Sequence, residues 1–306
     1  FGSNAASITK AGNGLLQLGG SNTFTGTTTV STGTLSLRGG AALIDVAAVT
    51  VAVGGTLKLN ASETIGSLSG AGAVNLQGNA LTIGGASTTT YSGVMSGVGG
   101  ALVKSGTGTL VLTGVNTFSG GATLSDGSLY VGNDAALGTG TVAMSGGVTL
   151  ASDSTTARAL ANAYSLNTAV TLGHVSNNGG LTLSGSGSLG ANTVVTTNSD
   201  VVLSGVISGG GFNLTKAGPG GLTLSGANTF SGGATLNAGP VYVGNDAAFG
   251  TGSLVIAGST VSSDGMSSRT VSNAYSMGGA VTLGDVVKTG TLTFSGAGTL
   301  TSDTTL

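Results

Sequence analysis

Short runs that alternate an apolar residue with a small polar one recur along the chain. Four of them follow one another in the middle of the sequence, and they begin at Thr109, Ser128, Val148 and Ala169. A two-residue period is typical of a β-strand that buries one face. The Gly, Asn and Asp residues between the runs favour tight turns. The pattern therefore predicts short strands that return about every 20 residues.

The sequence also repeats itself over a longer range. Residues 8–33, 102–127 and 214–239 align with one another, and each contains a Lys near its start and an Asn-Thr-Phe tripeptide further on. The second and third copies stay in register for much longer, so that residues 102–189 and 214–300 are two copies of one unit. Long repeat units thus begin near residues 8, 102 and 214, and we expect a single domain over residues 1–306.

The spacing of the copies favours a solenoid over a sandwich or barrel. The interval from Lys104 to Lys216 is longer than the interval from Lys10 to Lys104, and the excess is close to one short period. Such a difference is expected where stacked coils are gained or lost whole. The prediction is an all-β fold, a parallel β-helix or β-solenoid with about 20 residues per coil, which would make a rod about 70 Å long. Residues 158–166 are the one segment in which a helical turn competes with a strand.

In this fold one face of every strand points into a thin apolar core. We expect inward positions for four leucines of the second and third copies, Leu110, Leu112, Leu222 and Leu224. Ser and Thr on the outer face avoid the repulsion that stacked like charges would cause at about 4.8 Å.

Composition removes several classes of protein. There are 60 Gly but only 2 Pro, with no every-third-residue register, so the chain is not collagen. Eight Lys and Arg spread over 306 residues cannot form a basic patch, and nucleic acid is not an expected partner. No apolar stretch is long enough to insert into a membrane, and the absence of Cys excludes disulfides and thiolate chemistry. Phe1 is not expected to be the start of the translated protein.

The motif at residues 214–239 resembles a known repeat. It reads Leu-Thr-Lys-x-Gly, then alternating Leu, then Asn-Thr-Phe-Ser-Gly and Thr-Leu-x-x-Gly; residues 102–127 match nearly as well and residues 8–33 less well. This pattern is similar to the passenger-associated transport repeat of bacterial autotransporters. The resemblance implies a right-handed β-helical passenger, exported from a Gram-negative bacterium through a C-terminal outer-membrane barrel, and a repeat without catalytic residues.

Residues that could carry chemistry are few. His174 is the sole histidine, and Asp285 takes its place in the next long unit, which is typical of a solvated turn position. Residues 185–190 match G-x-G-x-x-G, but a chain this rich in Gly produces that pattern by chance. The ten acidic residues are too scattered for a calcium ladder or a glycosidase pair. We therefore predict no catalytic, cofactor-binding or metal-binding residues, and no cofactor.

The positions singled out are structural. Three Asn residues are expected in left-handed turns, each followed two residues later by a Phe in the core: Asn22, Phe24, Asn116, Phe118, Asn228 and Phe230. The five tyrosines could serve as adhesive contacts, but the sequence does not show which way they point: Tyr91, Tyr130, Tyr164, Tyr242 and Tyr275.

These features predict an extracellular structural or adhesive rod of a cell-surface or secreted protein, and not an enzyme. Two alternatives stay open, a fibre subunit that stacks end to end and an enzymatic passenger with its catalytic part elsewhere. Expected partners are further copies of the chain, through end-to-end self-association, and an unidentified ligand on a host or cell surface.

Overall fold

The computed structural model describes residues 5–302. Within this range every regular element is a short β-strand, and no helix is present that could cross a membrane. The chain forms two compact units, Phe1–Ala143 and Met144–Leu306, with β17 (Val142–Met144) at the boundary. Whether the units act as the single domain expected over residues 1–306 stays a prediction.

Unit 1 consists of three parallel sheets through which the chain passes in turn. The first sheet contains β1 (Ile8–Lys10), β3 (Thr28–Val30), β5 (Ala48–Val51), β8 (Ser67–Gly70), β11 (Thr89–Tyr91), β14 (Thr109–Leu112) and β16 (Ser128–Val131). The second contains β2 (Leu15–Leu18), β4 (Gly33–Leu37), β6 (Gly55–Leu59), β9 (Ala73–Asn75) and β12 (Val94–Ser96). The third contains β7 (Glu63–Ile65), β10 (Ala80–Ile83), β13 (Ala101–Lys104) and β15 (Ala122–Leu124).

Unit 2 follows the same plan. Its first sheet contains β18 (Thr149–Ser152), β21 (Val170–Leu172), β24 (Thr193–Thr197), β27 (Asn213–Ala217), β29 (Gly233–Leu236), β31 (Leu254–Ile256), β34 (Tyr275–Met277) and β37 (Gly298–Leu300). The second contains β19 (Arg158–Leu160), β22 (Leu181–Leu183), β25 (Val201–Leu203), β28 (Leu222–Leu224), β30 (Pro240–Val243), β32 (Thr260–Ser263) and β35 (Thr282–Leu283). The third contains β20 (Tyr164–Leu166), β23 (Gly187–Leu189) and β26 (Ile207–Ser208), while β33 (Arg269–Val271) pairs with β36 (Leu292–Phe294).

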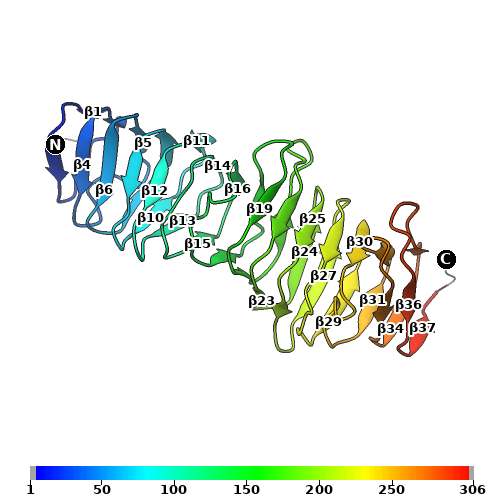
Figure 1. Cartoon of the computed structure of the whole chain (residues 1–306). Coiled ribbons are helices and arrows are strands. Elements are labelled where there is room, and N and C mark those ends of the chain that lie inside the picture. Colours follow the sequence, from blue (N-terminus) through cyan, green and yellow to red (C-terminus); the bar gives the residue numbers. More distant parts are fainter. Residues whose placement is uncertain (1–4, 303–306) are drawn as a thin grey trace. The chain divides into compact units, whose positions relative to one another are not determined.

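Each unit is a parallel β-solenoid, as the sequence predicted. Within a unit, strands of successive turns lie side by side (Figure 1) and pair in parallel. Val49 pairs with Leu68 across one of the shorter turns, and Val170 pairs with Val195 across one of the longer ones. The expected period of about 20 residues per coil is confirmed. The right-handed sense of winding stays a prediction.

The core consists of aligned apolar side chains. Leu35 pairs with Leu57 and Leu37 with Leu59 on adjacent strands, and all four side chains are 0% exposed. The four leucines expected to point inward are buried: Leu110, Leu112, Leu222 and Leu224. Because polar residues alternate with these positions, most strands have one buried face and one outer face.

The helical alternative for residues 158–166 is wrong. This segment forms β19 and β20, in two different sheets, with a bend between them. Arg158 and Leu160 pair with Leu181 and Leu183 of the next turn, and this stacking decides the conformation over any local helical tendency.

Candidate functional site

Each of the three aligned segments buries a lysine at the same position. Lys10, Lys104 and Lys216 are only 6%, 2% and 0% exposed, although Lys is among the residues least often buried. The Lys216 Nζ atom donates to the backbone oxygens of Ala217 at 3.0 Å, Gly218 at 2.8 Å and Ala238 at 2.8 Å. The first two oxygens belong to the turn of Lys216 and the third to the next turn. The ammonium group therefore links two successive turns of the solenoid.

A glycine makes room for each of these ammonium groups. Gly239 has φ +73°, and a Cβ atom there would lie 2.4 Å from the Gly218 oxygen and 3.0 Å from the Lys216 Nζ atom. Gly33 faces Lys10 and Gly127 faces Lys104 in the same way, at would-be Cβ–Nζ distances of 2.6 and 2.9 Å. The lysine and the glycine of each copy thus form one structural device, which the sequence analysis did not recognise. The signal was present, since three of the eight cations stand at equivalent positions.

Burial weakens the basicity of two of these lysines, Lys104 and Lys216. Loss of solvation lowers the pKa of Lys216 to about 8. It also lowers the pKa of Lys104, an effect that the negative charge of Asp126 partly opposes. No carboxylate is ion-paired with these ammonium groups among residues 5–302, and the hydrogen bonds that compensate for their burial go to backbone oxygens.

The asparagine of the Asn-Thr-Phe tripeptide is a second bridge. Asn228 is 2% exposed; its Oδ1 accepts from the Ile207 backbone N at 2.8 Å, and its Nδ2 donates to the Ala248 oxygen at 2.6 Å. Asn116 makes the same two bonds, to Met95 at 2.7 Å and Ala136 at 2.6 Å. Each side chain therefore joins the turn before it to the turn after it.

The position of this bridge explains why an amide is needed. Met95 lies in β12 and Ile207 in β26, which are the last strands of their sheets. The backbone N of each residue would otherwise lack the next strand as a partner. The Asn side chain accepts from that N, and the following Thr donates to the carbonyl oxygen of the same residue, at 2.9 Å in both copies. The tripeptide thus closes the edge of a sheet.

The expected left-handed turns at these asparagines are wrong, whereas the buried phenylalanines are confirmed. The one non-glycine residue with positive φ among residues 5–302 is Gln77. Asn is present for its side-chain amide and not for its backbone freedom. Phe24, Phe118 and Phe230 are 2%, 0% and 0% exposed. In the first copy, Asn22 is only half-buried, and its Nδ2 donates to the Ala42 oxygen at 3.0 Å.

Glu63 is a buried acid that the sequence analysis treated as one of a scattered set. Its side chain is 2% exposed, and its carboxylate accepts from the backbone N of Leu43 at 2.7 Å and of Ala42 at 3.4 Å. Burial raises its pKa, and these two hydrogen bonds oppose the rise. Like the lysines and asparagines, Glu63 binds the backbone of a neighbouring turn.

His174 and Asp285 occupy equivalent turns, as their exchange in the sequence predicted. The His174 Nδ1 atom accepts from the backbone N of Ser176 and of Asn177, both at 3.1 Å. Asp285 Oδ1 accepts from Val287 at 2.8 Å and Lys288 at 3.0 Å, again two and three residues ahead. Both side chains therefore cap a loop.

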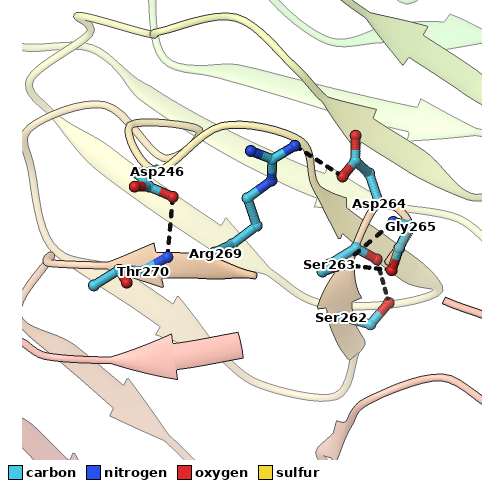
Figure 2. Close-up of polar contacts among 7 residues, drawn as sticks. All are labelled: Asp246, Ser262, Ser263, Asp264, Gly265, Arg269 and Thr270. Atoms are coloured by element: carbon cyan, nitrogen blue, oxygen red, sulfur yellow. Dashed lines mark hydrogen bonds and ion pairs between the residues drawn. The ribbon is translucent and has the colours of Figure 1, made fainter. Parts of the chain in front are cut away.

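Four further acids stabilise a loop or connect neighbouring turns. Asp264 pairs with Arg269 at 3.2 Å, and Asp246 accepts from the Thr270 backbone N at 3.0 Å (Figure 2). Asp153 pairs with Arg158 at 3.4 Å in the preceding long unit, and Asp200 accepts from a backbone N on the following turn. Both ion pairs are partly solvated, so each contributes about 1 kcal/mol or less. No group of three metal-ligating side chains occurs among the described residues.

The tyrosines divide into two classes. Tyr91 and Tyr164 are buried and burial raises their pKa, while the other three are half-buried. The Tyr91 hydroxyl donates to the Gly72 oxygen at 2.8 Å. A Cβ at Gly187 would lie 2.6 Å from the Tyr164 ring, so that this glycine of the G-x-G-x-x-G pattern serves packing. The pattern lies on β23, with no helix after it.

Comparison with known families identifies the segments that carry these bridges. A sequence profile described as the passenger-associated transport repeat matches residues 8–37, 102–131 and 214–240. Three segments of the chain are thus similar to this repeat. Each repeat contains one buried lysine with its glycine and one Asn-Thr-Phe tripeptide, and the resemblance inferred from the sequence is confirmed. Searches of curated proteins and of solved structures find no match.

Proposed function

We propose that the chain is a structural segment of a secreted or outer-surface protein of a Gram-negative bacterium, and that it serves adhesion, biofilm or matrix formation. The observation that carries the proposal is the use of the repeated polar side chains. Lys216 and Asn228, with their counterparts, bind backbone groups of neighbouring turns inside the solenoid. Polar side chains that bind the backbone of neighbouring turns stabilise the solenoid, which favours a structural role for the chain. The match to the passenger-associated transport repeat supports an exported passenger.

Antibody labelling of the bacterium that carries the gene tests the location. Antibodies raised against the 306-residue chain should label intact cells, or detect the protein in the medium. Labelling that requires permeabilised cells would contradict an outer location. Deletion of this segment from the gene, at an unchanged level of the remaining protein, should reduce attachment or biofilm mass. Normal attachment after deletion would reject the adhesive role and leave the location standing.

The proposed structural role includes no catalytic activity of this chain. His174 holds a loop as Asp285 does in the next unit, so the His174→Ala variant should retain every activity of the purified chain. A hydrolytic activity that the parent chain shows and this variant loses would overturn the non-enzymatic role. An enzymatic passenger with its catalytic part elsewhere would instead show activity only in the full-length protein.

End-to-end association is the second candidate. Leu15 in β2 and Leu300 in β37 are 61% and 64% exposed, and both lie on strands with an unpaired edge among residues 5–302. A second copy could pair with such edges. Sedimentation velocity over a concentration series should then show growing assemblies, and Leu15→Lys with Leu300→Lys should abolish them. A chain that stays monomeric at every concentration would reject this candidate.

A further inference from the structure

One outer sheet face of unit 1 differs in chemistry from the Ser- and Thr-rich surface around it. It belongs to the sheet β2-β4-β6-β9-β12, blue to cyan in Figure 1. Pairing aligns Gln17, Ser36, Lys58, Asn75 and Ser96 on successive strands. Residues two positions further on add a second row of long polar side chains. The amide–cation face comprises Gln17, Arg38, Lys58, Asn60, Asn75 and Gln77.

The glutamines of the chain and the cations of unit 1 that reach solvent are confined to this face. Gln17 and Gln77 are its only two glutamines. Unit 1 has four cations, and two of them, Lys10 and Lys104, are buried bridges. The two that reach solvent, Arg38 and Lys58, both lie on the amide–cation face. None of these six residues belongs to the Lys–Gly pair or the Asn-Thr-Phe tripeptide that recur in the three repeats.

The two surface cations of unit 1 form no ion pair with an acid among the residues that the structure describes. The two ion pairs found among residues 5–302 are Arg158–Asp153 and Arg269–Asp264, both in unit 2. Arg38 instead donates to the Gln17 side-chain oxygen at 3.3 Å, which orients the guanidinium along the sheet. Unpaired cations on neighbouring strands favour a partner with negative charge.

The same face is hollowed at one end. A hollow of about 500 Å³ is lined by Asn75, Gln77, Gly78, Ser96, Gly97 and Val98. Gln77 has φ 57°, and its backbone N and Nε2 both donate to Asn75 Oδ1, at 3.0 and 2.8 Å. A non-glycine residue held in a left-handed conformation costs about 1 kcal/mol or more. Here the strain fixes two amides side by side, with the Asn75 Nδ2 and the Gln77 Oε1 available for hydrogen bonds.

We propose that the amide–cation face binds a carboxylated polysaccharide lying across successive turns. Fixed amides hydrogen-bond sugar hydroxyls, and Arg and Lys bind carboxylates. Turns stacked about 4.8 Å apart present these groups repeatedly, so an extended polymer gains affinity from several weak contacts. An acidic peptide would more readily add to a strand edge than lie on a sheet face. The proposal names a ligand class for the extracellular role proposed above. It rests on that role only in assuming that the chain meets the ligand outside the cell.

Binding of the purified chain to sodium polygalacturonate tests the proposal. Calorimetry or affinity electrophoresis should detect binding that weakens steeply with salt. The double variant Arg38→Gln with Lys58→Gln should bind about tenfold more weakly or worse. The Gln77→Gly variant removes the amide but keeps the left-handed backbone, and should bind a few-fold more weakly. Circular dichroism should show that both variants remain folded.

A matched control separates this face from net charge. The double variant Arg269→Gln with Lys288→Gln removes two cations from unit 2 and should bind as the parent chain does. Equal losses in both double variants, or no binding by the parent chain, would overturn the proposal. Equally tight binding of poly-L-glutamate would reject a polysaccharide, and equally tight binding of methyl-esterified polygalacturonate would reject the charge argument. Antibody labelling tests the proposed location, and polysaccharide binding by the purified chain tests the proposed ligand. Failure of one proposal can therefore be told apart from failure of the other.

Discussion

Removal of one buried amide tests whether the Asn-Thr-Phe tripeptide holds three turns together. In the Asn228→Ala variant, the Ile207 backbone N loses its acceptor at 2.8 Å and the Ala248 oxygen loses its donor at 2.6 Å. Both groups are enclosed by the solenoid, because Ile207 and Ala248 are 0% exposed. Water therefore cannot replace the amide without opening the structure locally.

The expected cost follows from the two groups left unsatisfied. An unpaired buried backbone group costs about 1–3 kcal/mol, so the variant should lose about 2–6 kcal/mol of unfolding free energy. Asn116→Ala should lose a similar amount, because its two bonds have nearly the same lengths. Asn22→Ala is the matched control: the same tripeptide position is half-buried there, and we expect a loss of about 1 kcal/mol or less.

Denaturant unfolding followed by circular dichroism measures these losses, and hydrogen exchange at Ile207 locates them. Asn228→Asp adds a discriminating variant, because it keeps the acceptor for Ile207 but places an oxygen against the Ala248 oxygen. It should also be strongly destabilised. If Asn228→Ala and Asn22→Ala lose the same free energy within about 0.5 kcal/mol, or if Asn228→Asp is as stable as the parent chain, the bridge does not hold the turns together.

Three other substitutions test the remaining features of the core. Gly239→Ala should cost several kcal/mol, because its Cβ would lie 2.4 Å from a backbone oxygen. Gly211→Ala, with a similar φ (+76°) and open space around it, should cost about 1 kcal/mol. Equal losses of unfolding free energy, measured with denaturant, would refute the packing argument. Folding lowers the pKa of Lys216 from 10.5 to about 8, so between these pH values the unfolded chain binds more protons than the folded chain. As pH rises through this range, the parent chain should therefore gain stability relative to Lys216→Met, by up to about 1.4 kcal/mol per pH unit. A stability difference between the two chains that stays flat or falls with pH would contradict this sign. Leu224→Asp buries an unpaired charge in a fully apolar position and should cost about 4 kcal/mol or more of unfolding free energy. Protection from hydrogen exchange should be lost first in β25, β28 and β30, and unchanged protection there would mean that the side chain does not point inward.

The sequence predicts the solenoid because alternation and stacking act on every strand. Leu110 and Leu112 lie at alternate positions, and pairing places Leu129 and Val131 of the next turn beside them. A shift by one residue would turn every apolar side chain of a strand outward, so the pattern determines the register. The buried phenylalanines follow from the same reasoning.

The buried bridges could not be predicted from that alternation. An inward Lys, Asn or Glu has the same polarity in the sequence as an outward one, and its burial is favourable only where a backbone group lacks a partner. Such groups occur where a sheet ends, as β12 does beside Asn116 and β26 beside Asn228. The end of a sheet depends on the path of neighbouring turns, which local periodicity does not encode. The incorrect left-handed turns came from assigning to the Asn backbone a role that belongs to its side chain.

Recurrence distinguishes the two uses of polar side chains in this molecule. Lys10, Lys104 and Lys216 recur with the transport repeats, and each is buried against backbone oxygens. A polar residue that must return whenever the same turn returns is required by the fold. Arg38 and Lys58 have no counterpart in the other two repeats, and both reach solvent. Since the solenoid forms those other turns without them, the fold does not require their charges, and this freedom from a structural role supports the anionic ligand proposed for the amide–cation face.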